Sequence, residues 1–208
     1  MKIQSKKFYE KLSKFKEKKK GLLHLFLVKK FTCMNKQILD LGCGKGELAY
    51  FFAQMDNKIR AIDVSKPMLN YAMSVNKHKN ITYLLQDIRS LKLKKKFDVI
   101  FAINSLVHIK SLGHLLRQIY SLLKKDGKFI LCFPHPTQDL KEIKDYLKEQ
   151  LIRTRTKFGI VEQYYRPIQF YLNLLIEERF AINKIYEFKL KKEKIPFFFI
   201  VELKKKLK

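Results

Sequence analysis

Short apolar runs alternate with amphipathic stretches along most of the chain. The run Phe97–Ile103 is unbroken, which is typical of a strand buried on both faces of a sheet. Ser65 is placed to cap a helix that has Pro67 in its first turn. The pattern predicts strands at 37–41, 58–64, 81–86, 97–103 and 128–133, and helices at 47–54, 66–76 and 111–123. This alternation predicts an α/β fold with helices on both faces of a mostly parallel sheet.

The pattern changes after Pro136. Residues 137–180 have helix-like spacing, and two strands are expected after them, at 182–190 and 197–203. The link between those strands is short enough for a hairpin. We therefore expect a Rossmann-like, doubly wound sheet of seven strands, mostly parallel with an antiparallel final strand. The expected organisation is an N-terminal helical lid segment at 1–36 and one domain at 37–208, with 137–180 forming a helical cap between strands five and six.

Length and cysteine content exclude several protein classes. The chain has 208 residues, of which 47% are hydrophobic, so general disorder is excluded. Its longest apolar runs are too short to span a membrane, and the basic start lacks the small-residue cleavage site of a secretory signal. The three cysteines show no Cys-x-x-Cys spacing. We expect a reducing, cytoplasmic location and no metal site.

The net charge of +26 suggests an anionic partner. However, only seven of the 45 basic residues are arginine, the residue best suited to bidentate recognition of phosphate and guanine. A generally solvated lysine surface explains the charge slightly better. Nucleic acid therefore stays open as a partner but is not favoured, and the sequence leaves the oligomeric state undetermined.

Glycines occur where the first predicted strand turns into the first helix, in the segment Ile38-Leu39-Asp40-Leu41-Gly42-Cys43-Gly44-Lys45-Gly46-Glu47-Leu48. Glycine permits unusual dihedral angles there and lets a ligand approach the backbone. Glu47 stands where a dinucleotide fingerprint needs its last glycine, and Gly46 stands where a P-loop needs Ser or Thr. Both phosphate-binding interpretations are weakened, which leaves a nucleoside ligand with a positive centre.

Three acidic residues are expected beside this loop. Asp63 ends the second strand, where a carboxylate can accept hydrogen bonds from both hydroxyls of a ribose. Asp87 ends the third strand, where it can meet the exocyclic amine of adenine, and Asp40 precedes the loop. Three acids at one pocket of so basic a chain fit a ligand that carries a sulfonium and an ammonium group.

These segments resemble the class I S-adenosylmethionine-dependent methyltransferases. Residues 38–46 look like the first motif of that family, with Lys45 as the one departure, and residues 61–69 look like its second. The third motif matches Gln86-Asp87-Ile88, the fourth matches 97–100 with 104–109, and the turn into strand five matches 122–129. Five motifs in order, over residues 37–135, make a far more specific signal than the glycines alone.

The resemblance implies S-adenosyl-L-methionine as cofactor and assigns its contacts residue by residue. Gly42, Gly44 and the backbone of Cys43 would line the methionine part, with Asp40 near its amino group. Asp63 would hold the ribose, with Val64 beside it. Met68 would pack on the adenine edge, and Asp87 and the Ile88 N–H would recognise the adenine. Asn104 would border the sulfonium.

Candidate catalytic residues follow strands four and five. His108 stands where the family often has a histidine on the substrate side, and it is either a general base or a residue that shapes the pocket. His135 has a similar position after strand five. Tyr164 and Arg166 are candidates for binding the substrate, with Arg166 available for an anionic group. Tyr9 and Phe15 are possible lid residues.

The position after strand four, Asn104-Ser105-Leu106-Val107, lacks the Asp/Asn-Pro-Pro-Tyr sequence common in methylation of base amines. Cys43 and Cys132 are better explained as small buried residues than as nucleophiles of C5-pyrimidine methylation. We expect a methyltransferase acting on a small molecule or a carrier-bound acid. An RNA methyltransferase, and a non-catalytic cofactor-binding or regulatory protein, remain as alternatives.

Overall fold

A computed structural model describes residues 18–156, 159–190 and 192–206. A seven-stranded sheet forms its centre, in the order β3-β2-β1-β4-β5-β9-β8. The strands of the sheet are β1 (Gln37–Leu41), β2 (Lys58–Asp63), β3 (Ile81–Leu85), β4 (Phe97–Ile103), β5 (Leu123–Pro134), β8 (Phe180–Phe188) and β9 (Phe198–Lys205). The first five are parallel, whereas β9 runs antiparallel to both of its neighbours, β5 and β8. The predicted Rossmann-like α/β fold with an antiparallel final strand is confirmed.

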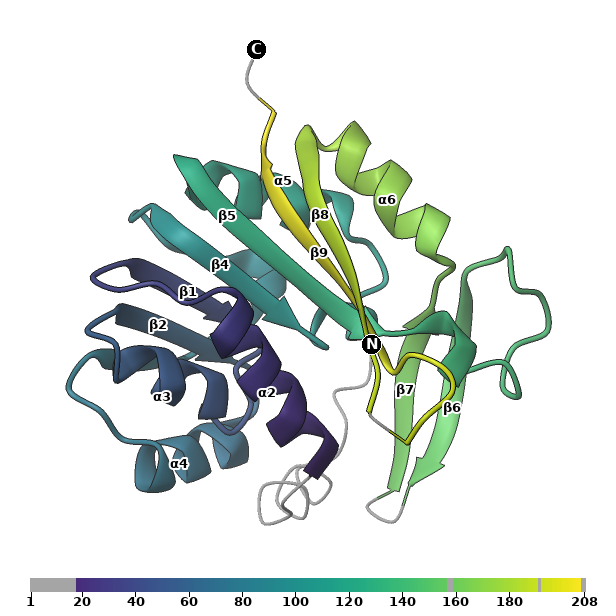
Figure 1. Ribbon diagram of the computed structural model, residues 1–208, viewed down its shortest axis with the longest axis horizontal. Coiled ribbons are helices and arrows are strands. Elements are labelled where there is room, and N and C mark those ends of the chain that lie inside the picture. The colour runs from purple at the N-terminus through teal and green to yellow at the C-terminus, as the bar shows by residue number, and fades with distance from the viewer. Residues whose placement is uncertain (1–17, 157–158, 191, 207–208) are drawn as a thin grey trace.

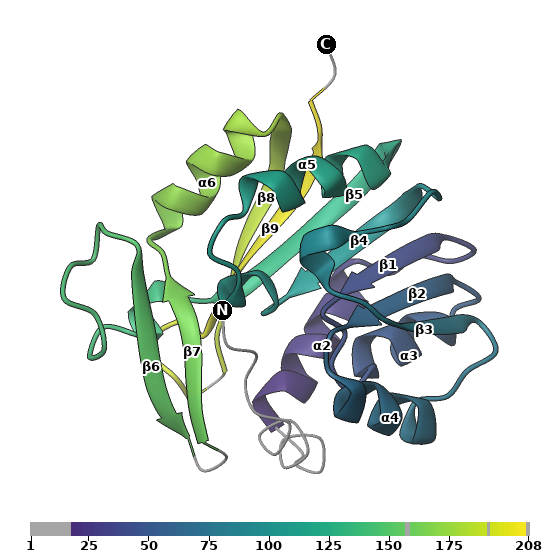
Figure 2. The same ribbon diagram turned by 180° about the vertical axis from the view of Figure 1, so that it is seen from behind.

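Helices cover both faces of this sheet, as Figures 1 and 2 show from opposite sides. The α-helices are α2 (Lys18–Lys30), α3 (Glu47–Ala53), α4 (Lys66–Val75), α5 (Gly113–Leu122) and α6 (Ile168–Glu177). Three short 3-10 helices are η1 (Ile88–Ser90), η2 (Leu106–His108) and η3 (Pro136–Gln138). The predicted cap of α4 is present, since the Ser65 hydroxyl accepts a hydrogen bond from the Met68 N–H at 3.4 Å.

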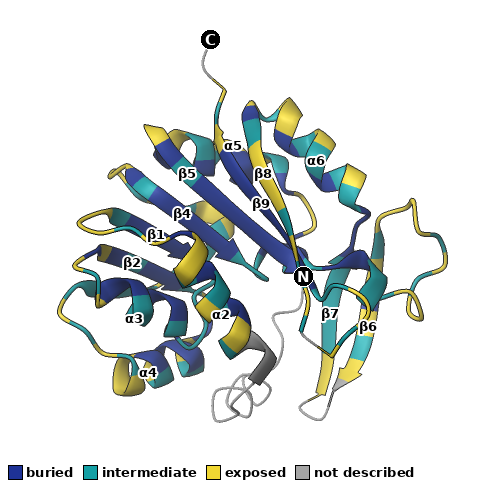
Figure 3. Ribbon diagram, viewed as in Figure 1, coloured by how far each residue is buried: buried dark blue, intermediate teal, exposed yellow. Residues whose placement is uncertain are grey.

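Alternate side chains of the strands enter two separate cores, because successive residues of a strand point to opposite faces. Ile38 of β1 packs with α2 and α3 on one face, whereas Leu39 packs with α5 and α6 on the other. Figure 3 shows the central strands buried along most of their length. This two-sided burial explains why the strand segments are continuous apolar runs.

The predicted helical cap at residues 137–180 is only partly helical: α6 is a helix, whereas the described residues between η3 and α6 contain no α-helix. Residues 140–149 form turns, and β6 (Gln150–Thr156) and β7 (Gly159–Tyr165) form an antiparallel hairpin before α6. The hairpin segments are rich in β-branched residues, which favour a pleated strand. Gly159 has a φ of 135°, which a glycine at the turn can adopt.

Residues 1–17 of the proposed lid, which include Tyr9 and Phe15, lie outside the described residues. The described helix α2 lies along the sheet, where Leu23, Leu27 and Phe31 are buried in the core with β1 and α3. A lid function of residues 1–36 stays a prediction. Among the described helices, none combines the length and the apolarity that crossing a lipid bilayer requires.

Candidate active site

The glycine loop follows the carboxyl end of β1. Gly42, Gly44 and Gly46 have φ angles of 74°, 53° and 72°, a region that favours glycine. The N–H groups of Gly42 and Cys43 both donate to the Ile62 carbonyl, at 2.8 and 2.9 Å. A Cβ on Gly42 would lie 2.4 Å from the Cβ of Ser105. The loop is therefore held tightly between the ends of β2 and β4.

Asp63 joins this loop to the end of β2. Its carboxylate accepts hydrogen bonds from the Gly44 N–H and the Ser65 N–H, both at 2.8 Å. Burial raises the pKa of Asp63, although these hydrogen bonds oppose the shift. A carboxylate offers about four acceptor positions, and the interactions with Ser65, Gly44 and Val64 leave room for a ligand donor.

Asp40 is a second buried carboxylate beside the loop, only 3% exposed. Burial, together with the nearby charge of Asp63, raises the pKa of Asp40 to about 7. The Asp40 Oδ2 atom finds no hydrogen-bond donor among the described protein atoms. A cationic group or a donor at this place would satisfy the oxygen and favour its ionised form.

Further unpartnered polar atoms occur where β4 ends. Asn104 has a φ of 55°, and its side-chain Oδ1 is buried without a partner among the described atoms. The hydroxyl of Ser105, which packs on Gly42, is also buried and unpartnered within that part of the chain. A strained backbone and orphaned polar groups at one strand end are typical of a binding site. The sequence did not single out Ser105.

The predicted adenine end is formed by the turn after β3. The Asp87 carboxylate accepts from the N–H of Arg89 at 2.8 Å and pairs with the Arg89 guanidinium. Hydrogen bonds from Arg89 lower the pKa of Asp87. Ile88 begins η1, Met68 is buried at the start of α4, and Val64 is exposed at 42%. Asp87 is therefore already engaged by a cation of its own chain.

Tyr83 on β3 packs against the glycine loop at Gly46, a contact that the sequence does not predict. Its hydroxyl donates to the Asn76 carbonyl at 2.9 Å, and the Asn76 amide donates to the Lys45 carbonyl at 2.8 Å. A Cβ on Gly46 would lie 2.3 Å from the Tyr83 hydroxyl oxygen. The ring thus fills the space that the missing side chain of Gly46 leaves.

His108 ends η2, which follows β4. Its Nδ1 lies 3.0 Å from the carbonyl oxygen of Glu162 on β7. Because a carbonyl only accepts, Nδ1 carries the proton and Nε2 is the basic nitrogen of the neutral ring. His108 also lies near enough to Asp63 to lower the pKa of that carboxyl group. His108 thus lies between Asp63, at the carboxyl end of β2, and the β6–β7 hairpin.

His135 directly follows the carboxyl end of β5 and has different surroundings from His108. The ring is buried, with Nδ1 at 2.7 Å from the Thr137 hydroxyl and Nε2 at 2.9 Å from Glu187 Oε1 on β8. Both ring nitrogens therefore have protein partners. The geometry supports a structural link between β5 and β8, and it gives no argument for the predicted catalytic role.

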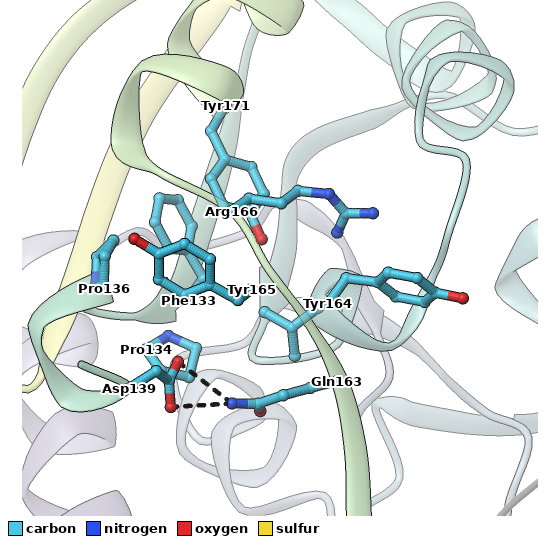
Figure 4. Close-up of a pocket in the computed structure, with 10 residues that line it drawn as sticks. Phe133, Pro134, Pro136, Asp139, Gln163, Tyr164, Tyr165, Arg166 and Tyr171 are labelled. Carbon is cyan, nitrogen blue, oxygen red and sulfur yellow. Dashed lines mark hydrogen bonds between the residues drawn. The ribbon is translucent and has the colours of Figure 1, made fainter. Parts of the chain in front are cut away.

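A small cavity of about 10 Å³ lies between η2, the end of β5, β7 and α6. This volume is about what a single water molecule needs. Figure 4 shows aromatic rings around the cavity, with polar groups at two places in the wall. The lining residues are Val107, Phe133, Pro134, Pro136, Asp139, Gln163, Tyr164, Tyr165, Arg166 and Tyr171. Tyr164 and Arg166, both predicted to bind substrate, are among them.

Arg166 is buried, and most of its guanidinium is engaged by protein groups. Nε donates to Glu149 Oε2 at 2.5 Å, and Nη2 donates to the carbonyls of Ile109 and Lys110 at 2.8 Å. Nη1 is buried and finds no acceptor among the described protein atoms. Arg166 therefore fixes the turn after η2 to the hairpin, and its guanidinium also interacts with the side chain of Tyr171.

Asp139 is the acidic residue of the cavity wall, and no motif in the sequence indicates it. Gln163 Nε2 lies 3.3 and 3.4 Å from its two carboxylate oxygens. Burial and the nearby charge of Glu142 raise the pKa of Asp139 to about 6. The helix-like spacing of residues 137–180 gives no reason to bring Asp139 beside Gln163.

Comparison with known proteins agrees with this geometry. A family model described as a methyltransferase domain matches residues 34–175. The malonyl-[acyl-carrier protein] O-methyltransferase of Bacillus cereus is 30% identical over 128 residues, 59% of this chain and 48% of that protein. The ubiquinone biosynthesis O-methyltransferase of Pelagibacter ubique is 34% identical over 95 residues, 45% of this chain and 40% of that protein. The chain thus spans less than half of the length of either relative.

A solved S-adenosylmethionine-dependent methyltransferase from Mesorhizobium loti has the same fold. Its TM-score is 0.70 at 20% sequence identity, over 88% of this chain and 98% of that one. The family model covers the glycine loop, the strand-end acids, η2 and the hairpin. These findings confirm the resemblance that the five motifs indicated, to methyltransferases that use S-adenosyl-L-methionine. The chain belongs to the methyltransferase domain family.

Proposed function

We propose that this chain transfers a methyl group from S-adenosyl-L-methionine to a small molecule or to a small acid held on a carrier. The family match supports the reaction, and relatives that methylate a carrier-bound acyl group and a ubiquinone precursor support the acceptor class. Because the chain spans less than half of those relatives, the acceptor is inferred from the site itself.

The residues at the carboxyl ends of the strands fit the cofactor. The unpartnered Asp40 Oδ2 is an acceptor suited to its ammonium group, and the unpartnered Asn104 Oδ1 would border its sulfonium. Asp63 keeps lone pairs for the ribose hydroxyls while its other interactions fix the glycine loop. Asp87 would recognise the adenine amine with Ile88, and this carboxylate has to share its oxygens with Arg89. Gly42, Cys43, Gly44, Val64 and Met68 would complete the walls.

When bound, the cofactor supplies an electrophilic methyl group on a sulfonium. The chain contributes orientation and exclusion of water, which are the main requirements of an in-line displacement. His108 holds η2 against β7, and thereby aligns the cavity wall with the cofactor side of the sheet. Tyr164 and Arg166 close the cavity, with the Arg166 guanidinium centred 5.0 Å from the Tyr164 ring.

The observation that carries the acceptor class is the cavity beside η2. It is lined mainly by aromatic and proline side chains, Asp139 and Gln163 lie in its wall, and its volume is about 10 Å³. Such a space suits the small polar tip of a metabolite. A nucleobase is several times larger than the one water for which there is room. These features favour a small acceptor over RNA.

The test is incubation of the chain with methyl-labelled S-adenosyl-L-methionine and a cell extract separated into metabolites, carrier proteins and RNA. We expect label in the metabolite or carrier fraction. Label confined to RNA would replace this proposal with an RNA methyltransferase. Cofactor binding without transfer to any fraction would favour a non-catalytic, cofactor-binding protein.

A further inference from the structure

The cavity wall holds one acidic side chain that the proposed function does not yet use. Asp139 follows η3 and lies opposite Gln163 of β7, and Figure 4 shows the two side chains meeting at one end of the cavity. The remainder of the wall is mainly aromatic and proline. A carboxylate in such surroundings needs a donor, and the 3.3 and 3.4 Å contacts from one amide nitrogen are long for hydrogen bonds.

We propose that Asp139 accepts the proton that a hydroxyl or amino acceptor loses when it is methylated. The inference rests on the proposed function and narrows its acceptor to hydroxyl and amino groups, which excludes methylation of the carboxylate of an acid. In the reaction, a lone pair of the acceptor oxygen or nitrogen forms a bond to the methyl carbon. The carbon–sulfur bond breaks with its electron pair left on sulfur, and the O–H or N–H proton moves to a carboxylate oxygen of Asp139.

The charges around Asp139 suit this role. Glu142 on its own segment disfavours the ionised form, and burial acts in the same direction, which brings the pKa to about 6. The cationic residue of the cavity lining, Arg166, is paired with Glu149 at 2.5 Å. Tyr165 and Tyr171, the other titratable groups that feel the charge of Asp139, keep high pKa values because they are buried. A base of pKa near 6 is ionised at neutral pH and is effective there.

His108 is the competing proton acceptor, and the structure favours Asp139 over it. Val107 contributes to the cavity wall, whereas the next residue, His108, is not among the lining residues. The Nδ1 of His108 is used to hold β7 through the Glu162 carbonyl. We therefore treat His108 as a positioning residue and Asp139 as the residue that touches the acceptor.

The chemical nature of the product tests this inference separately from the proposed function. A methyl ether or methylamine resists mild alkali, whereas a methyl ester releases labelled methanol. We expect alkali-stable label in the metabolite or carrier fraction. Alkali-labile label there would overturn the Asp139 inference and leave the proposed function intact. Label in RNA alone, or in no fraction, would overturn both.

Substitution identifies the base. Asp139→Asn keeps the shape of the side chain but cannot take up a proton, so we expect the rate of alkali-stable labelling to fall at least about a hundredfold at pH 7.5. The pH–rate profile of the unmodified chain should rise through about pH 6, and this limb should disappear in Asp139→Asn but persist in His108→Gln. Loss of the limb only in His108→Gln would overturn the inference.

Two controls keep the result interpretable. Asp145→Asn removes a half-buried carboxylate of the same segment, which is not among the residues that line the cavity and accepts from the Leu147 N–H, and it should keep most of the rate. Calorimetry with S-adenosylhomocysteine should give equal affinity for Asp139→Asn and the unmodified chain, which shows that the variant is folded. An equal loss of rate in both Asp variants would contradict a specific role of Asp139.

Discussion

The Asp63 carboxylate accepts a hydrogen bond from the backbone N–H of Gly44 at 2.8 Å. The contact joins residues from two strand ends, 19 positions apart in the sequence, and it holds the glycine loop in its left-handed conformation. The same carboxylate also fixes the start of the segment leading to α4 through Ser65. One side chain thus sets the shape of the loop and faces the place predicted for the ribose.

Replacement of Gly42 by alanine should distort this loop. Its φ of 74° disfavours a side chain, and the new Cβ would lie 2.4 Å from Ser105 Cβ. We expect a loss of stability on the order of 2 to 4 kcal/mol, as left-handed strain and overpacking combine. Gly44→Ala is the matched control, since φ is 53° and a Cβ there meets nothing within 4 Å. It should lose about 1 to 2 kcal/mol. Chemical denaturation measures both, and equal losses would contradict the packing argument.

The raised pKa of Asp40 predicts a pH-dependent stability. A carboxyl group with a pKa of about 7 in the folded chain holds a proton that the unfolded chain releases near pH 4. Its contribution to stability is therefore complete below pH 4 and is lost as the pH rises toward 7. The Asp40→Asn variant has no carboxyl group at this position and avoids this loss. Its free energy of unfolding should therefore rise relative to that of the unmodified chain between pH 5 and 8.

The gain should be on the order of 2 to 4 kcal/mol. Thermal unfolding at several pH values gives the difference between the two proteins, which cancels the contributions of other titrating groups. A difference that does not change with pH would mean that Asp40 is ionised throughout. The cofactor should reduce the effect, since its ammonium group stabilises the charged carboxylate.

His108→Ala should affect turnover more than cofactor binding. Loss of the contact with the Glu162 carbonyl frees η2 from β7 and disturbs the cavity wall. We expect the rate of label transfer to fall by at least about tenfold, because small misplacements are costly in catalysis. His114→Ala, on the exposed side of α5, is the control. Unchanged turnover in His108→Ala would remove the residue from the site.

His135→Ala should act on stability instead. The ring bonds to Thr137 and Glu187, and its removal leaves the buried end of β5 without the link to β8. We expect a loss of about 1 to 3 kcal/mol in unfolding free energy, with unchanged affinity for S-adenosylhomocysteine. A fall in cofactor affinity without loss of stability would restore the catalytic interpretation of His135.

The sequence predicts the sheet and the position of the glycine loop well, because both depend on local patterns. The local structure is predicted by nearby residues in three places: the apolar run of β4, the cap at Ser65 and the glycines after β1. The hairpin is different, because the spacing of Leu140, Leu147 and Leu151 resembles a helix, although all three are exposed in the structure. Asp139 meets Gln163 only through this tertiary arrangement, so the acceptor cavity was beyond prediction from local spacing.

The central claim is that the strand ends with the glycine loop bind S-adenosyl-L-methionine. Calorimetric titration of the cofactor into the unmodified chain and into Asp63→Ala tests it most directly. Asp98→Ala is the matched control, since Asp98 also accepts a backbone N–H, from Gln37 at 2.8 Å, but lies at the opposite edge of the sheet. We predict one bound cofactor per chain, binding abolished in Asp63→Ala, and binding retained in Asp98→Ala. Absence of binding to the unmodified chain, or unmodified affinity in Asp63→Ala, would contradict this account.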